Sequence, residues 1–131
     1  MFGREECRMT KRNIVHIELP AADQEKAGKF YHDLFGWQIE YDPELKYVQW
    51  DAGSGSSGGF NTIGDEFKAG EIIFYVASED IEADLKAAAK LGGLTVQGKT
   101  EIPNIGWYGI FKDPSGNRIG LYTSRNPEFN K

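Results

Sequence analysis

The sequence has little cysteine, little histidine and no long apolar run. Of its 131 residues, one is a cysteine (Cys7) and two are histidines. A single cysteine excludes an intrachain disulfide and a cysteine-rich metal site. No stretch approaches the roughly 18–20 apolar residues of a membrane-spanning helix, and the charged start of the chain is unlike a secretory signal. These absences favour a cytoplasmic protein that does not enter a membrane.

Positive charge is also scarce. The chain has 15 Lys and Arg against 20 Asp and Glu, a formal net charge of -5. A nucleic-acid-binding protein needs a basic face for the phosphates, so this class is excluded. The acidic balance favours neutral or cationic ligands. A chain of 131 residues is long enough for one domain, and 40% hydrophobic residues are enough to form its core.

One pattern occurs twice along the chain. The apolar run Ile14–Leu19 is followed by Asp23 and by a helical pattern that ends at Gly36. After about 57 residues a second apolar run, 72–76, is followed in the same way by Asp80 and a helical pattern. Two copies of one unit that face each other would enclose a cleft with two walls.

Both helices have recognisable ends and an apolar stripe. Asp23 suits an N-cap, and Gly36 suits a left-handed C-terminal stop. The second helix is expected to start near Ser78 or Asp80 and to end at Gly92-Gly93. The buried stripes predicted from helical spacing are Ala27, Phe30, Tyr31 and Leu34 in the first helix, and Ile81, Leu85, Ala88 and Ala89 in the second.

Three short strand-like runs follow each helix. They are 37–41, 47–51 and 60–63 in the first half, and 94–98, 107–111 and 118–122 in the second. The segment Asp113-Pro114-Ser115-Gly116-Asn117 predicts a tight hairpin between the last two. The fold class is therefore α+β, with β-α-β-β-β modules at 13–63 and 71–124. Residues 1–12 and 125–131 are expected to be tails, the first of them disordered.

The stretch Gly53–Gly59 contains two motifs that need a helix after them. Gly53, Gly55 and Gly58 fit a dinucleotide-binding GxGxxG pattern, and Ser57 fits the GxSxG elbow of hydrolases. The following residues predict a strand instead. We therefore interpret the stretch as a flexible loop.

The two histidines differ in their setting. His32 lies off the apolar face of its helix and is predicted to be a solvated surface residue. His16 lies in the opening strand, and Glu18 shares its face by the two-residue period of a strand. The pair could bind a metal, move protons or form a structural hydrogen bond.

Taken together, the paired modules, His16 ahead of Asp23, the segment "FYHDLFGW" and the late segment "DPSGNRIGLY" resemble the vicinal oxygen chelate superfamily. This group includes glyoxalases, bleomycin-resistance proteins and extradiol dioxygenases. The resemblance covers about residues 13–124. It implies that the modules form a curved open mixed sheet, usually completed in a homodimer. It also implies a central cleft that holds a small organic ligand and, in many members, a divalent metal.

The resemblance implies four metal-ligand positions, and this chain fills one of them. His16 takes the first. The region Gly58–Asn61 lacks the second, a carboxylate; Ile73 or Phe74 stands at the third, and Gly120 replaces the glutamate of the fourth. Metal sites need about three protein groups. We therefore expect no metal and no cofactor.

The leading interpretation is a metal-free protein that binds a small organic molecule between its modules. Two alternatives remain open: an enzyme of lyase, isomerase or dioxygenase type that uses His16 and Glu18 for acid–base or metal-assisted chemistry, and a protein-interaction module. Arg118 would bind a carboxylate of the ligand or pair with Glu18. The residues expected to contact the ligand are Trp50, Phe60, Asn61, Trp107, Arg118, Gly120 and Tyr122.

Overall fold

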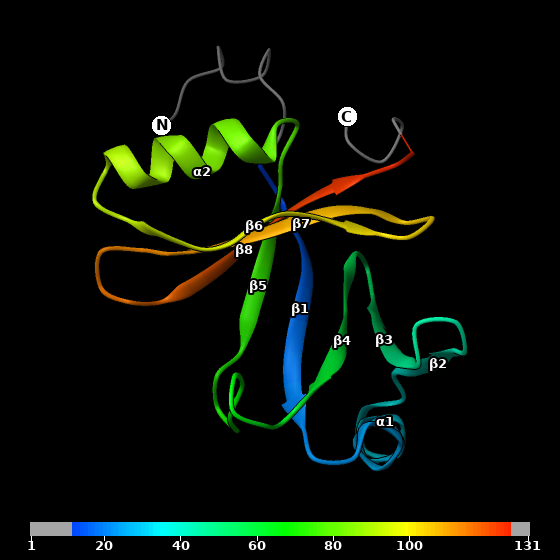
Figure 1. Ribbon diagram of the computed structural model, residues 1–131. Helices are drawn as coiled ribbons and strands as arrows, with labels where there is room; N and C mark the ends of the chain where they lie inside the picture. Colours follow the sequence, from blue (N-terminus) through cyan, green and yellow to red (C-terminus); the bar gives the residue numbers. More distant parts are fainter. Residues whose placement is uncertain (1–11, 127–131) are drawn as a thin grey trace. The chain divides into compact units, whose positions relative to one another are not determined.

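The computed structural model describes residues 12–126, which form two compact units (Figure 1). Residues Val15–Phe74 form one unit, and residues 12–14 with 75–126 form the other. We call residues 14–62 the first module and residues 73–124 the second module. Cys7 and most of the two predicted tails lie outside the described residues.

The first module is a four-stranded sheet with one helix. Its elements are β1 (Ile14–Ala21), α1 (Gln24–Phe35), β2 (Gln38–Asp42), β3 (Tyr47–Gly53) and β4 (Ser56–Thr62). The strand order is β2-β3-β4-β1, in which β1 and β4 are parallel and the other pairs antiparallel.

The second module repeats this topology. Its elements are β5 (Ile73–Ala77), α2 (Ile81–Lys90), β6 (Leu94–Ile102), β7 (Gly106–Lys112) and β8 (Arg118–Ser124), with the strand order β5-β8-β7-β6. The parallel pair is again the first and last strand, β5 and β8. The predicted α+β class with two β-α-β-β-β modules is therefore confirmed.

The predicted helix ends and the late hairpin are confirmed. Asp23 caps α1 by accepting a hydrogen bond from the Lys26 backbone N–H, and Asp80 caps α2 in the same way. Gly36 ends α1 in the left-handed conformation, with φ of 76°. The Asp113 backbone N–H donates to Asn117 across the hairpin. Neither described helix is long and apolar enough to cross a membrane.

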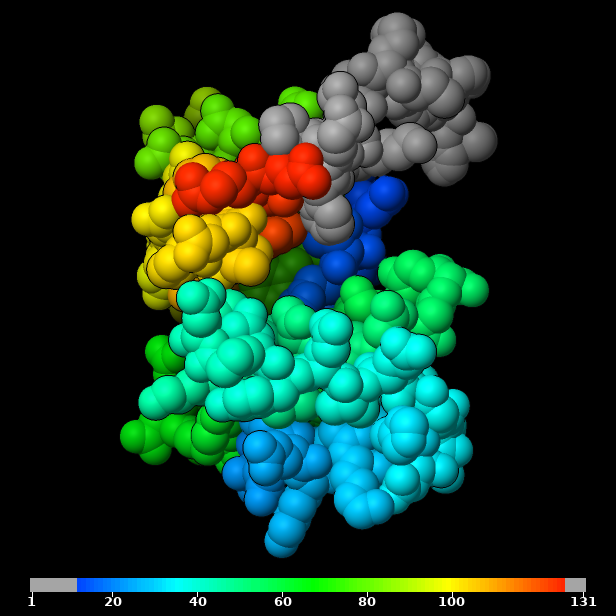
Figure 2. All heavy atoms as spheres, turned by 90° about the vertical axis from the view of Figure 1, so that its right-hand side faces the viewer, coloured from blue at the N-terminus to red at the C-terminus, as the bar shows by residue number. Residues whose placement is uncertain are grey.

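The buried face of α1 differs from the predicted stripe. Ala27 and Tyr31 pack on the sheet as expected, but Phe30 and Leu34 are 57% and 58% exposed, and the side chains of α1 (light blue) lie at the surface in Figure 2. The cause is Gly28, where an added Cβ would lie 2.9 Å from a methyl carbon of Ile39. The helix contacts the sheet closely at Gly28, and in this orientation Phe30 and Leu34 of the predicted stripe face outward.

The second predicted stripe also needs one correction. Ile81 and Leu85 are buried against Leu121, and Ala88 is half-buried, but Ala89 is exposed. At 3.6 residues per turn, Ala89 lies about 60° around the helix axis from the midline of Ile81 and Leu85, so it stands at the exposed edge of the buried face.

The glycine- and serine-rich stretch is not a loop throughout. Its second half, from Ser56, is the beginning of β4, and only the turn around Ser54 and Gly55 fits the prediction. The glycines permit close strand pairing, since a Cβ at Gly58 would overlap the carbonyl of Ile17 on β1. Neither nucleotide-binding nor hydrolase geometry is present, because a strand follows the motif.

Candidate functional site

His16 and Glu18 lie on the face of the first module's sheet that points away from α1. Their neighbours Ile17 and Leu19 pack into the core beneath the helix, so alternation along β1 turns His16 and Glu18 to the other side. The Nε2 atom of His16 lies 2.7 Å from a carboxylate oxygen of Glu18. The predicted sharing of a face is therefore correct.

A third residue, Tyr47 of β3, completes this cluster. Its hydroxyl lies 2.8 Å from Nε2 of His16 and donates a hydrogen bond to the same Glu18 oxygen. We call His16, Glu18 and Tyr47 the polar trio. Sequence reasoning missed Tyr47, although the alternation of β3, with Val48 and Trp50 in the core, would have placed it on this face.

Glu18 is the most enclosed member of the polar trio. The residue is only 8% exposed. Burial of a carboxylate is tolerated when it accepts hydrogen bonds, and here the imidazole and the phenol supply them. The carboxylate thereby fixes the orientation of the imidazole, an arrangement that suits both ligand anchoring and proton transfer.

Asn61 of β4 lies on the same face as the polar trio. The register pairs Glu18 with Gly59 and Pro20 with Asn61, so the two β4 residues share the side of Glu18. The Oδ1 atom of Asn61 is buried, and no hydrogen-bond donor of the described residues reaches it. A buried acceptor of this kind costs about 1–3 kcal/mol unless a donor satisfies it.

Trp50 and Phe60, which the sequence predicted as ligand contacts, are core residues instead. They are 4% and 1% exposed and pack with Tyr31 and Trp37 under α1. The stacked rings of Trp37 and Trp50 have centroids 4.4 Å apart. Because both strands alternate, these side chains point away from the face of the polar trio, and they offer no surface to a ligand there.

Trp107 also lies on the helix side of its sheet. It packs against the cluster of Ile81, Leu85 and Leu121, and the cations of Lys99 and Arg125 lie 5.3 Å and 4.7 Å from its ring centroid. These contacts explain the position of the Trp107 ring, which the sequence predicted as a ligand contact, without a ligand.

Arg118, Gly120 and Tyr122 share the face of β8 that points away from α2, as the sequence predicted. Leu121 lies on the helix side, and the alternation places the other three opposite it. Burial raises the pKa of the Tyr122 hydroxyl, and a hydrogen bond with Ser124 acts in the opposite direction. The predicted open space at Gly120 is wrong, because the ring of Tyr75 fills it.

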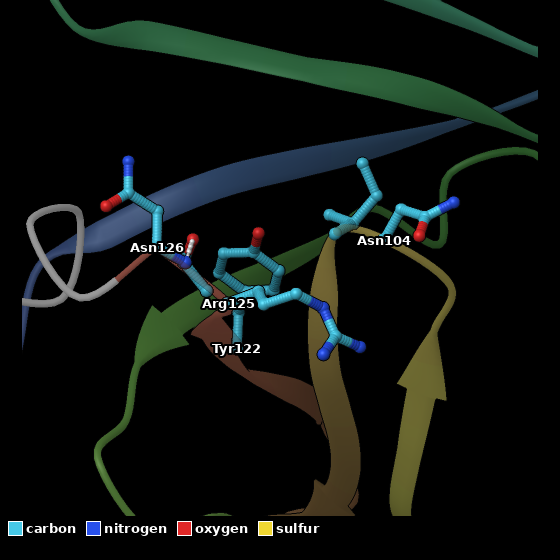
Figure 3. A pocket seen from close by; sticks show the side chains of 6 residues that line it. Asn104, Tyr122, Arg125 and Asn126 are labelled. Atoms are coloured by element: carbon cyan, nitrogen blue, oxygen red, sulfur yellow. Dashed lines mark hydrogen bonds between the residues drawn. The ribbon is translucent and has the colours of Figure 1, made fainter.

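Tyr122 lines a depression of about 460 Å³ at the end of the second module's sheet (Figure 3). The other lining residues come from the turn between β6 and β7 and from the end of β8 and the residues after it. Close by, the Asn126 backbone N–H donates to Ser124. The depression is lined by Asn104, Ile105, Tyr122, Ser124, Arg125 and Asn126.

His32 is an exposed residue, as predicted. Its Nδ1 atom donates to the carbonyl of Trp37, 2.9 Å away. It lines a groove of about 650 Å³ between α1 and the edge strand β2, together with the ion pair of Lys29 and Asp33. This groove lies on the helix side of the sheet, away from the polar trio.

The residues at the four expected metal-ligand positions do not fit a metal. His16 is present, but its Nε2 atom is engaged by Glu18 and Tyr47. The region Gly58–Asn61 contains no carboxylate, Gly120 carries no donor, and both Ile73 and Phe74 are apolar. Within residues 12–126, no group of three His, Cys, Asp or Glu side chains is arranged to hold an ion.

Replacement of Tyr47 by phenylalanine is expected to lower the free energy of unfolding by about 1–3 kcal/mol, because it removes one hydrogen bond from the buried carboxylate of Glu18. Urea denaturation measures the change. Tyr41→Phe is the matched control, since the Tyr41 residue is 55% exposed. Equal stability of the Tyr47 variant and the parent would contradict the assigned hydrogen bond.

The comparisons with known proteins agree with the fold and with the motifs. The sequence profile of the Glyoxalase/Bleomycin resistance protein/Dioxygenase superfamily matches residues 13–121. The chain belongs to this superfamily, so the resemblance inferred from its motifs is confirmed. A "Glyoxylase-like domain-containing protein" of Didymella fabae is 29% identical over 119 residues, which cover 84% of this chain and 92% of that protein.

Solved structures show the same fold at low identity. Methylmalonyl-CoA epimerase from Mycobacterium tuberculosis is 15% identical, with 94% of this chain and 95% of that chain covered and a TM-score of 0.65. A glyoxalase/bleomycin resistance protein/dioxygenase superfamily member from Vibrio splendidus 12B01 is 17% identical, with 83% and 97% covered and a TM-score of 0.60. At these identities the similarity establishes the fold alone.

Proposed function

We propose that this protein binds a small organic molecule on the sheet face that carries the polar trio and Asn61, without the metal common in its superfamily. The observation that carries the proposal is the buried Oδ1 atom of Asn61, which no donor of the described residues satisfies. Buried acceptors in folded proteins are nearly always paired with a protein group, a water or a ligand. A ligand with an N–H or O–H group would supply that donor.

The charges of the trio and of the chain define the ligand further. Glu18 brings an acceptor carboxylate to the same face as Asn61, and the whole chain has a net charge of -5. Two acceptors on one face suit a neutral or cationic molecule with at least one hydrogen-bond donor, such as an amine, an amide or an alcohol.

Acid–base catalysis is the second candidate. The hydrogen bond between His16 and Glu18 favours it, since a carboxylate that orients an imidazole prepares the ring to accept or donate a proton. A ligand that is recovered unchanged after incubation with the protein supports the binding role, whereas a chemically altered product supports this alternative.

The expected homodimer belongs to the same proposal. Phe30 and Leu34 are 57% and 58% exposed, and their spacing of four residues places them on one face of α1. Phe35, at the end of the helix, is 58% exposed. Apolar side chains gathered on one surface commonly mark a protein contact. The third interpretation, a module that only binds other proteins, would use such a surface without the polar trio.

The test is a thermal-shift screen of small amines, amides and alcohols, followed by titration of the strongest hit. Replacement of Asn61 or His16 by alanine is expected to weaken its binding by roughly 5- to 150-fold, which corresponds to the loss of one good contact. His32→Ala, on the helix side, is the control and should leave the affinity unchanged. If His32→Ala weakens binding while Asn61→Ala and His16→Ala leave the affinity unchanged, the ligand binds in the groove between α1 and β2 and the proposal is wrong.

A further inference from the structure

In each module, a glycine of the last strand pairs with a residue of the first strand at the same point of the sheet. In the first module the register pairs Glu18 of β1 with Gly59 of β4. In the second module it pairs Tyr75 of β5 with Gly120 of β8. The two glycines are therefore equivalent in the repeated topology, and both belong to regions where the superfamily resemblance led us to expect a metal ligand.

A tyrosine fills the space beside each glycine. A Cβ atom at Gly59 would overlap the hydroxyl end of Tyr47 and would lie 2.8 Å from its Cε1 atom. A Cβ atom at Gly120 would overlap the ring of Tyr75 and would lie 2.7 Å from its Cγ atom. Such approaches are far inside van der Waals contact, so neither position can carry a side chain unless its tyrosine moves.

Both tyrosines are held where they are. Tyr47 is fixed by its hydrogen bonds to His16 and Glu18. Tyr75 packs edge-on against Tyr108, with ring centroids 6.5 Å apart. At Gly120 the obstructing atoms include Cγ, close to the backbone of Tyr75, so a simple rotation of the ring does not clear the space.

We infer that Tyr47 and Tyr75 are the residues that exclude side-chain metal donors from positions 59 and 120. This inference deepens the proposed metal-free function, because it names the groups that occupy the donor space. In the first module, the presence of Tyr47 in this space has a second consequence. The hydroxyl of Tyr47 forms hydrogen bonds with Glu18 and His16. A group that fills the space of a metal ligand is therefore part of a hydrogen-bonded cluster.

The inference predicts a strong coupling between Tyr75 and Gly120. Gly120→Ala in the full chain is expected to lower the Tm by at least roughly 5 °C, because the new methyl group collides with the ring. In the background of Tyr75→Ala the same change should lower the Tm by less than half as much, since the ring is gone. Gly98→Ala is the control, because a Cβ at this strand position meets nothing within 4 Å.

A double-mutant cycle measured by thermal and urea denaturation decides the matter. If Gly120→Ala abolishes folding, recovery of a folded double variant supports the inference. Additive effects of the two changes, or a Gly120→Ala variant as stable as Gly98→Ala, would overturn it. The result does not depend on any ligand. Elemental analysis of the parent tests the proposed function separately, since one equivalent of metal lost in His16→Ala would contradict that proposal whatever the cycle shows.

Discussion

Replacement of Phe60 by alanine is expected to lower the free energy of unfolding by about 3–5 kcal/mol. The Phe60 residue is 1% exposed and lies in the core between β4 and α1, where its ring stacks on Tyr31 with centroids 6.0 Å apart. The change removes a large buried apolar surface and leaves a cavity that the neighbouring rings of Tyr31 and Trp37 cannot fill.

Equilibrium urea denaturation measures this loss. Phe30→Ala is the matched control, because it removes the same side chain from a position that is 57% exposed. The control should cost less than half as much. If Phe60→Ala costs no more than Phe30→Ala, the ring is not part of the core, and its earlier interpretation as a ligand contact would be restored.

Gly58→Ala is expected to lower the free energy of unfolding by at least about 3 kcal/mol, at or above the usual range for overpacking. A methyl group at Gly58 would overlap the backbone carbonyl of Ile17 and approach the Trp50 ring to 2.7 Å. The obstructing atom belongs to the backbone of the neighbouring strand, so relief requires β1 and β4 to separate.

The loss at Gly58 is measured by the same denaturation experiment, with Gly64→Ala as the control, because a Cβ at Gly64 meets nothing within 4 Å. Amide hydrogen exchange adds a local readout: the β1 and β4 amides should lose protection in the Gly58 variant. A variant with parental stability and unchanged exchange would contradict the parallel pairing of Ile17 with Gly58.

Local signals in the sequence predicted the architecture well. Asp23, Asp80 and Gly36 act on the backbone within one helical turn, so their roles could be inferred without knowledge of the fold. The exposure of Phe30 could not, because the rotation of α1 depends on the contact between Gly28 and Ile39, which are on different elements. Helical spacing alone treats every apolar residue of the stripe as equal.

The sequence predicted the part of the site that lies within one strand, but not the parts that depend on how strands pair. The two-residue period placed His16 and Glu18 together, but Tyr47 joins them only through the register of β1, β4 and β3. The register of these strands also turns Trp50 and Phe60 to the helix side. In the second module, the register of β5 with β8 brings Tyr75 beside Gly120. Which glycine leaves space and which lies under a tyrosine is therefore a property of strand pairing.

The most direct test of the proposed function is a calorimetric titration of the strongest screening hit into chelator-treated protein. Binding without a metal at the polar trio predicts the same affinity before and after chelation, and an affinity weakened roughly 5- to 150-fold in chelator-treated His16→Ala. Loss of binding on chelation, with recovery after one equivalent of a transition metal is added to the parent but not to His16→Ala, would contradict it.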